Sequence, residues 1–495
     1  MYHERRVWLL TSWVRPCSIV DHTDEILEAV KADLGKGTYE AQMSEVQSVQ
    51  NEIIYITKNL AKWAQDEKPE PVPFMYAINN PKVRKDPLGC VLVIGPFNLP
   101  FNLTFCPLLG AIAGGNTAVV KPSEQVPASA AVIAKIISQT LDPDCFRVVQ
   151  GGVQQTQALL AEKWDKIFFT GSANVGRIVA KAAAPNLTPV ILELGGKNPA
   201  FVTKKANTQL AARRLLWGKT FNVGQVCLSQ NVIFVDEEVV PTFVAGIKDA
   251  LAEFFPHGAK QSPDYGRIVS DRQFDRIKKM LDSTSGQIVI GGKMDATERF
   301  IEPTVVQVSD ASDPLIVEES FGPLITILPM NNLDEAIHLA NSIDSTPLAL
   351  YPYGSKQEVA QIIRETRSGG VSINDCYTHA VIPHVAFGGV GESGTGSYRG
   401  RASFDSFVHR RIITNTPNWL EKSLSVRYPP SEGKLAKYSK MTLEKPDFDR
   451  DGNVKFNLLR YILTFGGGTI KGGLVRASLL AAFAFVLQTA LNRTR

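Results

Sequence analysis

The side chains best suited to covalent chemistry in this chain are a cysteine and a glutamate, each close to glycines. Cys227 ends the segment FNVGQVC (residues 221–227), and Glu193 begins the segment ELGGK (residues 193–197). A thiol is a strong nucleophile only as the thiolate, and a nearby carboxylate can act as general base for the thiol or for a later water. Glycines let the backbone approach a substrate or cofactor closely. These groups together favour acyl chemistry through a covalent thioester.

Each of these residues alone also fits a simpler role. A single cysteine is most often a small buried hydrophobe, and a single glutamate is most often a solvated surface charge. Lys197 fits either a supporting role in the site or an ordinary surface position. Further motifs along the chain decide between these interpretations.

Eight motifs, taken in order, resemble those of the aldehyde dehydrogenase superfamily. Besides ELGGK and GQVC they are GPFNLP (95–100), KPSE (121–124), FTGS (169–172), EESFGP (318–323), GGVSIND (369–375) and FGGVGESG (387–394). The continuation GSYRG (396–400) and the later RYPP (427–430) look like the class 3 branch, which includes the fatty aldehyde dehydrogenases. The resemblance covers about residues 24–435. It implies a Rossmann-like NAD-binding domain, an α/β catalytic domain, a small β oligomerisation element and a C-terminal hydrophobic helix.

The resemblance also implies a catalytic role for each matching residue. Cys227 attacks the aldehyde carbon, and the Asn98 side-chain amide and the Cys227 backbone N–H hold the resulting oxyanion. Glu193 then activates the water that hydrolyses the thioester. Glu319 matches the carboxylate that holds the nicotinamide ribose, and Phe321 matches the ring that packs beside it.

The expected cofactor is NAD, with NADP left open because class 3 enzymes often accept both. Lys121 and Glu124 match the pair that binds the adenosine ribose hydroxyls, and a carboxylate there repels a 2′-phosphate. A strand over 166–169, a glycine turn and a helix over 174–184 predict an anion site at the helix N-terminus. The residues of that site are Gly171, Ser172 and Val175.

A second glycine-rich segment matches GxGxxG without the context of a dinucleotide site. Residues 389–394 read GVGESG, and the following TGS does not open a helix. Since a Rossmann fingerprint needs a strand before it and a helix after it, we do not expect a pyrophosphate site there.

The composition is that of an ordinary globular protein and gives no sign of a nucleic-acid partner. The chain has 495 residues, of which 44% are hydrophobic and 21% charged, and its net charge is +4 without a basic block. The six cysteines form no CxxC pair and no metal-ligand spacing, which favours a reducing compartment and no metal. The N-terminus does not read as a secretory signal.

Strands alternate with helical runs and so predict an α/β fold. Buried strands are expected at 90–95, 118–121, 166–169, 192–194, 200–203, 232–235, 288–290 and 325–328, after helices over 24–67. The expected domains are an NAD-binding domain (1–80 and 96–210), a catalytic domain (211–395), an oligomerisation element (81–95 and 396–425), a C-terminal extension (426–471) and a membrane anchor (472–491).

The expected anchor contains a single charge, Arg476, in twenty residues. About 20 apolar residues are needed for a helix to cross a bilayer, and a charge near one end can snorkel. A helix packed on the body is the alternative. We expect a membrane-anchored protein with a cytosol-facing catalytic body, on the endoplasmic reticulum or another intracellular membrane, and a homodimer by resemblance.

The function expected is NAD(P)-dependent oxidation of a hydrophobic, long-chain aldehyde to the carboxylic acid. Oxidation of an apocarotenal, a carotenoid-derived aldehyde, is the alternative substrate. Acyl transfer to coenzyme A on the same scaffold is disfavoured, because such enzymes lack the base found here as Glu193. A catalytically silent binding protein on this fold is disfavoured by the joint presence of Asn98, Glu193, Cys227 and Glu319.

Overall fold

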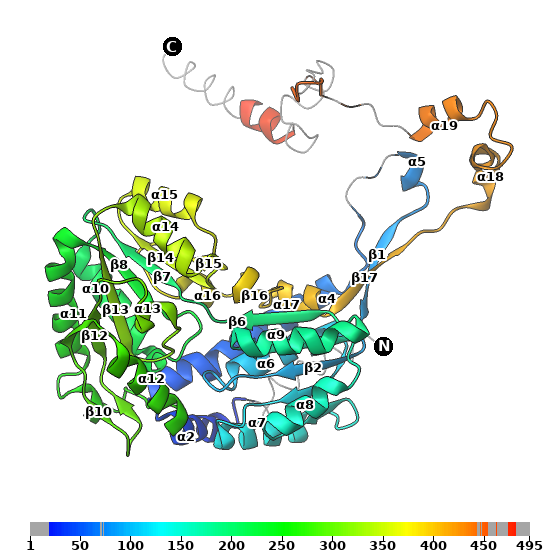
Figure 1. Ribbon diagram of the computed structural model, residues 1–495. Helices are drawn as coiled ribbons and strands as arrows, with labels where there is room; N and C mark the ends of the chain where they lie inside the picture. Colours follow the sequence, from blue (N-terminus) through cyan, green and yellow to red (C-terminus); the bar gives the residue numbers. More distant parts are fainter. Residues whose placement is uncertain are drawn as a thin grey trace, which may run out of the picture. The chain divides into compact units, whose positions relative to one another are not determined.

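The computed structural model describes residues 19–69, 72, 74–442, 446, 448–453, 462 and 474–481 (Figure 1). The chain divides into two compact units, one formed by residues 1–67 and 83–412 and the other by residues 68–82 and 413–495. The two large sheets and all the residues selected from the sequence for catalysis lie in the first unit.

The first large sheet has six strands in the order β16-β6-β5-β2-β3-β4. Its strands are β2 (Cys90–Ile94), β3 (Thr117–Lys121), β4 (Phe146–Val148), β5 (Lys166–Gly171), β6 (Val190–Leu194) and β16 (Gly394–Thr395). Strands β2 to β6 pair in parallel, whereas β16 runs antiparallel to β6. The chain leaves β2 toward β3 and β4 and later returns to build β5 and β6 on the other side, so the strand order reverses between β2 and β5.

Helices cover both faces of this sheet, which explains the continuous apolar strand sequences. Val91 and Val93 belong to the cluster that includes α4 (Ser48–Trp63), α6 (Asn102–Gly114) and α7 (Pro127–Thr140). Leu92 and Ile94 point to the other face. There they pack with residues of α8 (Val153–Ala161) and α9 (Ala173–Ala183).

The second large sheet has seven strands in the order β15-β14-β7-β8-β13-β12-β9. Its strands are β7 (Pro199–Val202), β8 (Val232–Asp236), β9 (Gln287–Ile290), β12 (Thr304–Gln307), β13 (Leu324–Met330), β14 (Ala349–Tyr353) and β15 (Gly370–Val371). One face packs on α10 (Thr208–Thr220) and α11 (Val240–Phe254). The other face packs on α12 (Asp271–Ser283), α14 (Leu333–Ile343) and α15 (Lys356–Glu365) (Figure 1).

The N-terminal helical region predicted over 24–67 is confirmed, with one feature that periodicity did not show. It consists of α2 (Thr23–Leu34), α3 (Thr38–Ala41), a π-helical turn over Gln42–Gln47 and α4. Gly35, with φ of 62°, ends α2 in the left-handed conformation that glycine adopts most easily. The break after α2 sets the direction of the segment that carries Lys36 and Glu40.

Two segments belong to a different part of the fold from the one expected. Strand β2 lies inside the six-stranded sheet rather than in an oligomerisation element at 81–95, because its apolar residues are buried on both faces. Strand β7 belongs to the second sheet although it precedes residue 211. The pairing of β1 (Lys82–Pro87) with β17 (Val408–Ile413) forms a separate two-stranded sheet, and its role in oligomerisation stays a prediction.

The second unit contains short helices among its described residues. These are α5 (Phe74–Ala77), α18 (Glu421–Leu424), α19 (Leu435–Thr442) and a helical stretch over 474–481. Within the described part of the chain, no helix combines the length and apolar character needed to cross a bilayer. Most of the anchor predicted over 472–491 lies outside the described residues. The C-terminal hydrophobic helix therefore stays a prediction.

Candidate active site

Cys227 follows a turn of unusual backbone conformation at the end of α10. Asn222, Val223 and Gly224 have φ values of 49°, 57° and 72°, all in the left-handed region. A branched residue such as Val223 rarely adopts this conformation, so the surrounding structure must hold the turn in place. Only glycine fits at position 224, because a Cβ there would lie 2.2 Å from the carbonyl oxygen of Gly322.

Asn98 lies beside this turn, as its predicted role in the oxyanion site requires. It is buried, and its Nδ2 donates a hydrogen bond of 3.0 Å to the carbonyl oxygen of Gln225. The Asn222 side chain donates to the carbonyl oxygens of both Asn98 and Gln225, at 2.8 and 3.0 Å. One amide hydrogen of Asn98 is thus fixed two residues before Cys227. The second can point toward a developing oxyanion.

Glu193 lies on β6 with Thr170 of β5 on one side and Gly394 of β16 on the other. Its side chain is 1% exposed, and neither carboxylate oxygen has a hydrogen-bond partner in the described structure. Burial raises the pKa of Glu193 to about 7, although the Cys227 thiol lowers it in part. A carboxylic acid with this pKa can gain or lose a proton near neutral pH, as a general base must.

The surroundings of Cys227 favour the neutral form of its thiol. The residue is only partly exposed, and burial raises the pKa of its thiol well above the ordinary value. The carboxylates of Glu193 and Glu319 raise that pKa further. Attack on an aldehyde therefore needs a group that takes the thiol proton, and Glu193 is the carboxylate placed to do so.

Glu319 faces the glycines that follow Glu193. A Cβ on Gly195 would lie 2.6 Å from both carboxylate oxygens of Glu319, so only glycine leaves room for this approach. Burial raises the pKa of Glu319 to about 7, while the backbone N–H of Gly196 and the charge of Lys219 act in the opposite direction. A cavity of about 340 Å³ begins here and continues along Lys197 toward α9 and α14.

The residues predicted to bind a dinucleotide gather at the carboxyl ends of the parallel strands. Ile94, Lys121 and Leu194 end β2, β3 and β6, and the register places Ile94 beside Lys121 and Leu194 beside Gly171. In open α/β sheets, ligands bind at this edge, where the strand order reverses.

The phosphate and ribose positions fit a dinucleotide as well. Ser172 caps α9 by accepting a hydrogen bond from the backbone nitrogen of Val175, so the helix N-terminus faces the cavity edge formed by Ala173. Lys121 and Glu124 form an ion pair of 2.6 Å. Burial acts to raise the pKa of Glu124, but the bond from Lys121 outweighs it and the pKa is lowered. An ionised carboxylate at this place favours free ribose hydroxyls over a 2′-phosphate.

Phe321 packs against the residue that precedes Asn98. It has φ of 46° and packs edge-on against Phe97, with 5.7 Å between ring centroids. Phe97 directly precedes Asn98. The structure therefore brings together every residue selected from the sequence for the nicotinamide end of the site.

Sequence reasoning missed several residues near Cys227. Trp217, Phe221 and Tyr377 form an aromatic cluster with ring centroids 5.7 to 6.0 Å apart. Tyr351 donates a hydrogen bond of 2.7 Å to the carbonyl oxygen of Leu228, next to the nucleophile. Trp217, Tyr351 and Tyr377 lie outside the motifs, so no local signal could have indicated them, whereas Phe221 opens the FNVGQVC segment but received no role there.

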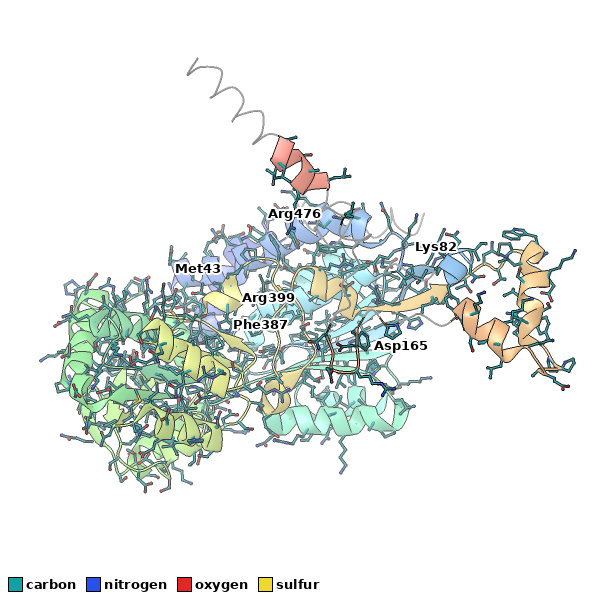
Figure 2. The ribbon with its side chains drawn as sticks, turned by 90° about the horizontal axis from the view of Figure 1, so that it is seen from above. Met43, Lys82, Asp165, Phe387, Arg399 and Arg476 are labelled. Carbon is teal, nitrogen blue, oxygen red and sulfur yellow. The ribbon has the colours of Figure 1, made fainter. Side chains whose placement is uncertain are left out.

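Arg399 is another residue near the site whose role was not predicted from the sequence. Its guanidinium lies 5.2 Å from the ring centroid of Phe387 and 5.7 Å from that of Tyr398 (Figure 2). Its positive charge lowers the pKa values of Glu193 and Cys227 in part. Arg399 belongs to the GSYRG segment, which the sequence analysis used only to assign the class 3 branch.

The GVGESG segment behaves as the sequence analysis expected. Gly391–Ser393 form a 3₁₀ turn and Gly394–Thr395 form β16, so no helix opens after the glycines. A Cβ on Gly394 would lie 2.0 Å from the carbonyl oxygen of Leu192. The glycines allow a close backbone approach beside Glu193.

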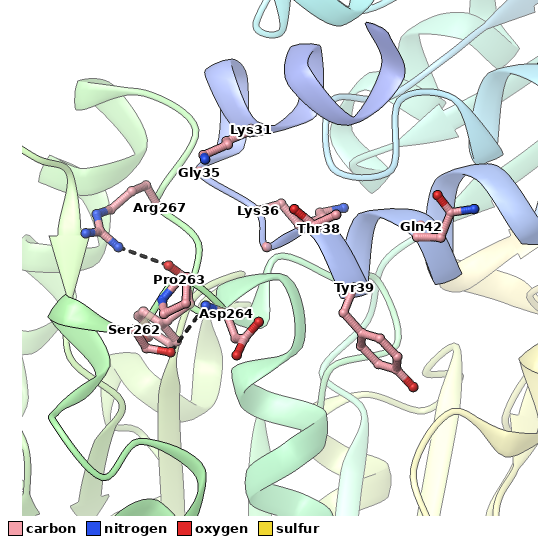
Figure 3. Close-up of a pocket in the computed structure, with 12 residues that line it drawn as sticks. Lys31, Gly35, Lys36, Thr38, Tyr39, Gln42, Ser262, Pro263, Asp264 and Arg267 are labelled. Carbon is pink, nitrogen blue, oxygen red and sulfur yellow. Dashed lines mark hydrogen bonds between the residues drawn. The ribbon is translucent and has the colours of Figure 1, made fainter. Parts of the chain in front are cut away.

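A cavity of about 840 Å³ lies between the segment that follows α2 and the loop Ser262–Arg267 (Figure 3). Gly35, Lys36 and Tyr39 line it on one side, and Asp264 lines it on the other. Although the cavity includes none of the catalytic residues, Lys36 Nζ lies 3.4 Å from the carbonyl oxygen of Asn98.

Comparison with known proteins agrees with this geometry. The model of the aldehyde dehydrogenase family matches residues 5–413. The chain belongs to the aldehyde dehydrogenase family. This aldehyde dehydrogenase is an NAD(P)-dependent oxidoreductase that acts on the aldehyde group, and its fold is that of the family.

Three similar proteins illustrate the relationship. The beta-apo-4'-carotenal oxygenase of Neurospora crassa is 50% identical over 93% of this chain and 88% of its own length. The dimeric NADP-preferring aldehyde dehydrogenase of Rattus norvegicus is 41% identical over 85% and 92%. The substrate-bound structure of Staphylococcus aureus AldH has a TM-score of 0.84 and 39% identity, covering 89% of this chain and 94% of that one.

Proposed function

We propose that this aldehyde dehydrogenase oxidises a long, hydrophobic aldehyde to its acid through a thioester on Cys227. The observation that carries the proposal is the buried pair of Cys227 and Glu193, next to the fixed amide of Asn98. The thiol can attack an aldehyde carbon, the carboxylate can take a proton, and the amide can stabilise the oxyanion.

Cys227 and Glu193 act in sequence. Glu193 accepts the thiol proton as sulfur bonds to the aldehyde carbon, and the Asn98 Nδ2 and the Cys227 backbone N–H stabilise the oxyanion. A nicotinamide cofactor held beside Glu319 and Phe321 would supply the acceptor for the hydride of this carbon. Glu193 then takes a proton from water, which attacks the thioester and releases the acid from Cys227. Because Glu193 acts twice, it must return its first proton to solvent between the two steps.

A carotenoid-derived aldehyde is the favoured substrate. The Neurospora crassa relative carries such a substrate in its name. The aromatic cluster of Trp217, Phe221 and Tyr377 provides flat ring surfaces suited to a planar polyene. A long-chain fatty aldehyde is the second candidate, favoured by the apolar sequence at the C-terminus.

Attachment to an intracellular membrane through residues 472–491, with the catalytic body facing the cytosol, belongs to the same proposal. A lipid-soluble aldehyde would be concentrated at such a surface. A homodimer joined through β1 and β17 is proposed as well, supported by the dimeric rat relative. Sedimentation of a form truncated after Lys455 tests the dimer, and a clean monomer would refute it.

A substrate panel tests the proposed reaction. NADH and NADPH formation would be followed with hexanal, hexadecenal and an apocarotenal, each with and without coenzyme A. We expect a higher kcat/KM for the two long aldehydes than for hexanal and no need for coenzyme A. Dependence on coenzyme A would replace hydrolysis by acyl transfer, and a preference for hexanal would remove the hydrophobic substrate.

A further inference from the structure

The left-handed turn before Cys227 is held by a carboxylate from the N-terminal helices. Glu40 on α3 accepts a hydrogen bond of 3.0 Å from the backbone nitrogen of Asn222. Asn222 in turn donates from its side chain to the carbonyl oxygens of Asn98 and Gln225. Glu40 thus holds the residue that ties the oxyanion side of the site to the nucleophile segment.

A buried ion pair next to this carboxylate holds the oxyanion side. Lys36 Nζ lies 2.9 Å from Glu45 Oε1 and 3.4 Å from the carbonyl oxygen of Asn98. The other oxygen of Glu45 accepts hydrogen bonds from the backbone nitrogens of Phe101 and Asn102, at 3.2 and 3.1 Å. The segment between α2 and α4 therefore contacts both chain segments of the site, the one that carries Asn98 and the one that leads to Cys227.

We propose that Glu40 is a positioning residue for the nucleophile, whose carboxylate holds the Asn222 amide and so sets the turn that presents Cys227. The proposal rests on the assignment of Cys227 as the nucleophile in the proposed function. The physical reason is the conformation of Asn222, at φ of 49°. A non-glycine residue keeps such a conformation only where its surroundings determine it, and a buried backbone N–H without an acceptor is unfavourable.

Five groups decide how well Glu40 accepts this hydrogen bond. Burial raises the pKa of Glu40 to about 7, the charge of Lys36 and the N–H of Asn222 lower it, and Glu45 and Asp264 raise it. Tyr377 also lies within electrostatic reach, because Glu40 raises the pKa of its hydroxyl. A hydrogen bond to an ionised acceptor is stronger than one to a neutral carboxyl. The hydrogen bond from the Asn222 backbone nitrogen to Glu40 therefore weakens as the pH falls through about 7.

The test measures how fast iodoacetamide alkylates Cys227 in the full-length protein, with the modified residue identified by mass spectrometry. Alkylation needs neither aldehyde nor cofactor, so the result stands even if the proposed oxidation fails. Glu40→Ala should slow alkylation at pH 8 by about tenfold or more, because a displaced turn moves the Cys227 thiol away from Glu193, the carboxylate that takes its proton. Glu40→Gln keeps an acceptor oxygen and should stay within about threefold of wild type at pH 8.

The pH dependence separates positioning from a purely structural role. The ratio of the wild-type rate to the Glu40→Gln rate should fall as the pH drops through about 7, because only the wild type loses an ionised acceptor. Glu28→Ala, at an exposed position on α2, is the matched control and should alkylate like the wild type. The proposal would be overturned if Cys227 in Glu40→Ala were alkylated as fast as in the wild type, or if both Glu40 variants were slowed equally. A ratio of wild-type to Glu40→Gln rates that does not change with pH would overturn it as well. If Glu40→Ala does not fold, the ratio for Glu40→Gln decides alone.

Discussion

The side-chain amide of Asn98 is tied to the carbonyl oxygen of Gln225 by a hydrogen bond of 3.0 Å, two residues before the nucleophile. A donor anchored in this way does not need to reorganise when negative charge develops on the substrate oxygen. The oxyanion site that we propose would thus be in place before the substrate arrives.

Asn98→Ala should lower kcat by about 10²- to 10³-fold, the usual effect of losing one oxyanion donor. The buried carbonyl of Gln225 keeps its bond from Asn222, so the variant should still fold. Steady-state kinetics and thermal unfolding check both expectations, with the exposed Asn331→Ala as control. A kcat within threefold of wild type would remove Asn98 from the oxyanion site.

Cys227→Ser should abolish aldehyde oxidation and leave NAD binding intact. A serine hydroxyl is a far weaker nucleophile than a thiolate, whereas the cavity beside Glu319 does not depend on the sulfur. Fluorescence titration with NADH and an activity assay measure the two properties. Cys90→Ser, at the opposite end of β2 from Asn98, serves as control. Turnover near wild type in Cys227→Ser would exclude the thioester mechanism.

Glu193→Gln should still form the acyl-enzyme, more slowly because the Cys227 thiol must give its proton to water, and hydrolysis of the acyl-enzyme should be slowed much further. A rapid-mixing experiment should show a burst of NADH followed by stalled turnover. In the wild type, kcat should rise with pH through about 7, because Glu193 is active only after losing its proton. The variant should lose this inflection. If the burst itself disappears, Glu193 is required already for attack by the thiol.

The same substitution should stabilise the protein at alkaline pH. The folded pKa of Glu193 is about 7 and the ordinary value is 4.5, so the folded protein binds the proton more tightly than the unfolded chain. The associated stability is complete below about pH 4.5 and is lost as the pH rises through about 7, by ~3 kcal/mol in total. Glu193→Gln avoids this loss.

Thermal unfolding checks this expectation. The Tm of Glu193→Gln should exceed that of the wild type at pH 8.5 and approach it at pH 5. A constant difference in Tm across this range would show that ionisation of Glu193 does not lower the free energy of unfolding.

Truncation after Lys455 should release the protein from membranes and preserve activity on short aldehydes. The apolar stretch over 472–491 lies beyond every catalytic motif, and burial of apolar groups in lipid contributes roughly 0.8 kcal/mol per CH₂. Membranes washed with high salt should retain the full-length protein and lose the truncated one. Release of the full-length protein by salt would mean that its attachment is electrostatic. Equal losses of activity on short and long aldehydes would separate the tail from substrate choice.

Eight of the thirteen strands in the two large sheets could be predicted from the sequence, because they are short apolar runs bounded by turn residues, whereas β4, β12, β14, β15 and β16 were not predicted. β2 shows the limit of that method, since its assignment to an oligomerisation element followed the family pattern instead of its own burial. The contact between Glu40 and Asn222 could not be predicted, because the residues are 182 positions apart. The left-handed φ of Val223 was equally hidden, as nothing in a valine's type indicates it. Cys227 and Glu193 were found because both lie in short motifs.

The chain crosses between its two large sheets beside the reactive groups. It leaves β6 at Leu194 and enters β7 at Pro199, and it returns through β16, whose Gly394 pairs with Glu193. Any movement of one sheet against the other must bend these two connections, of which the first carries Gly195 against the Glu319 carboxylate. The crossings between the sheets and the candidate active site are therefore formed by the same few residues. A substitution that bends either connection would therefore also shift the carboxylates of Glu193 or Glu319 relative to Cys227.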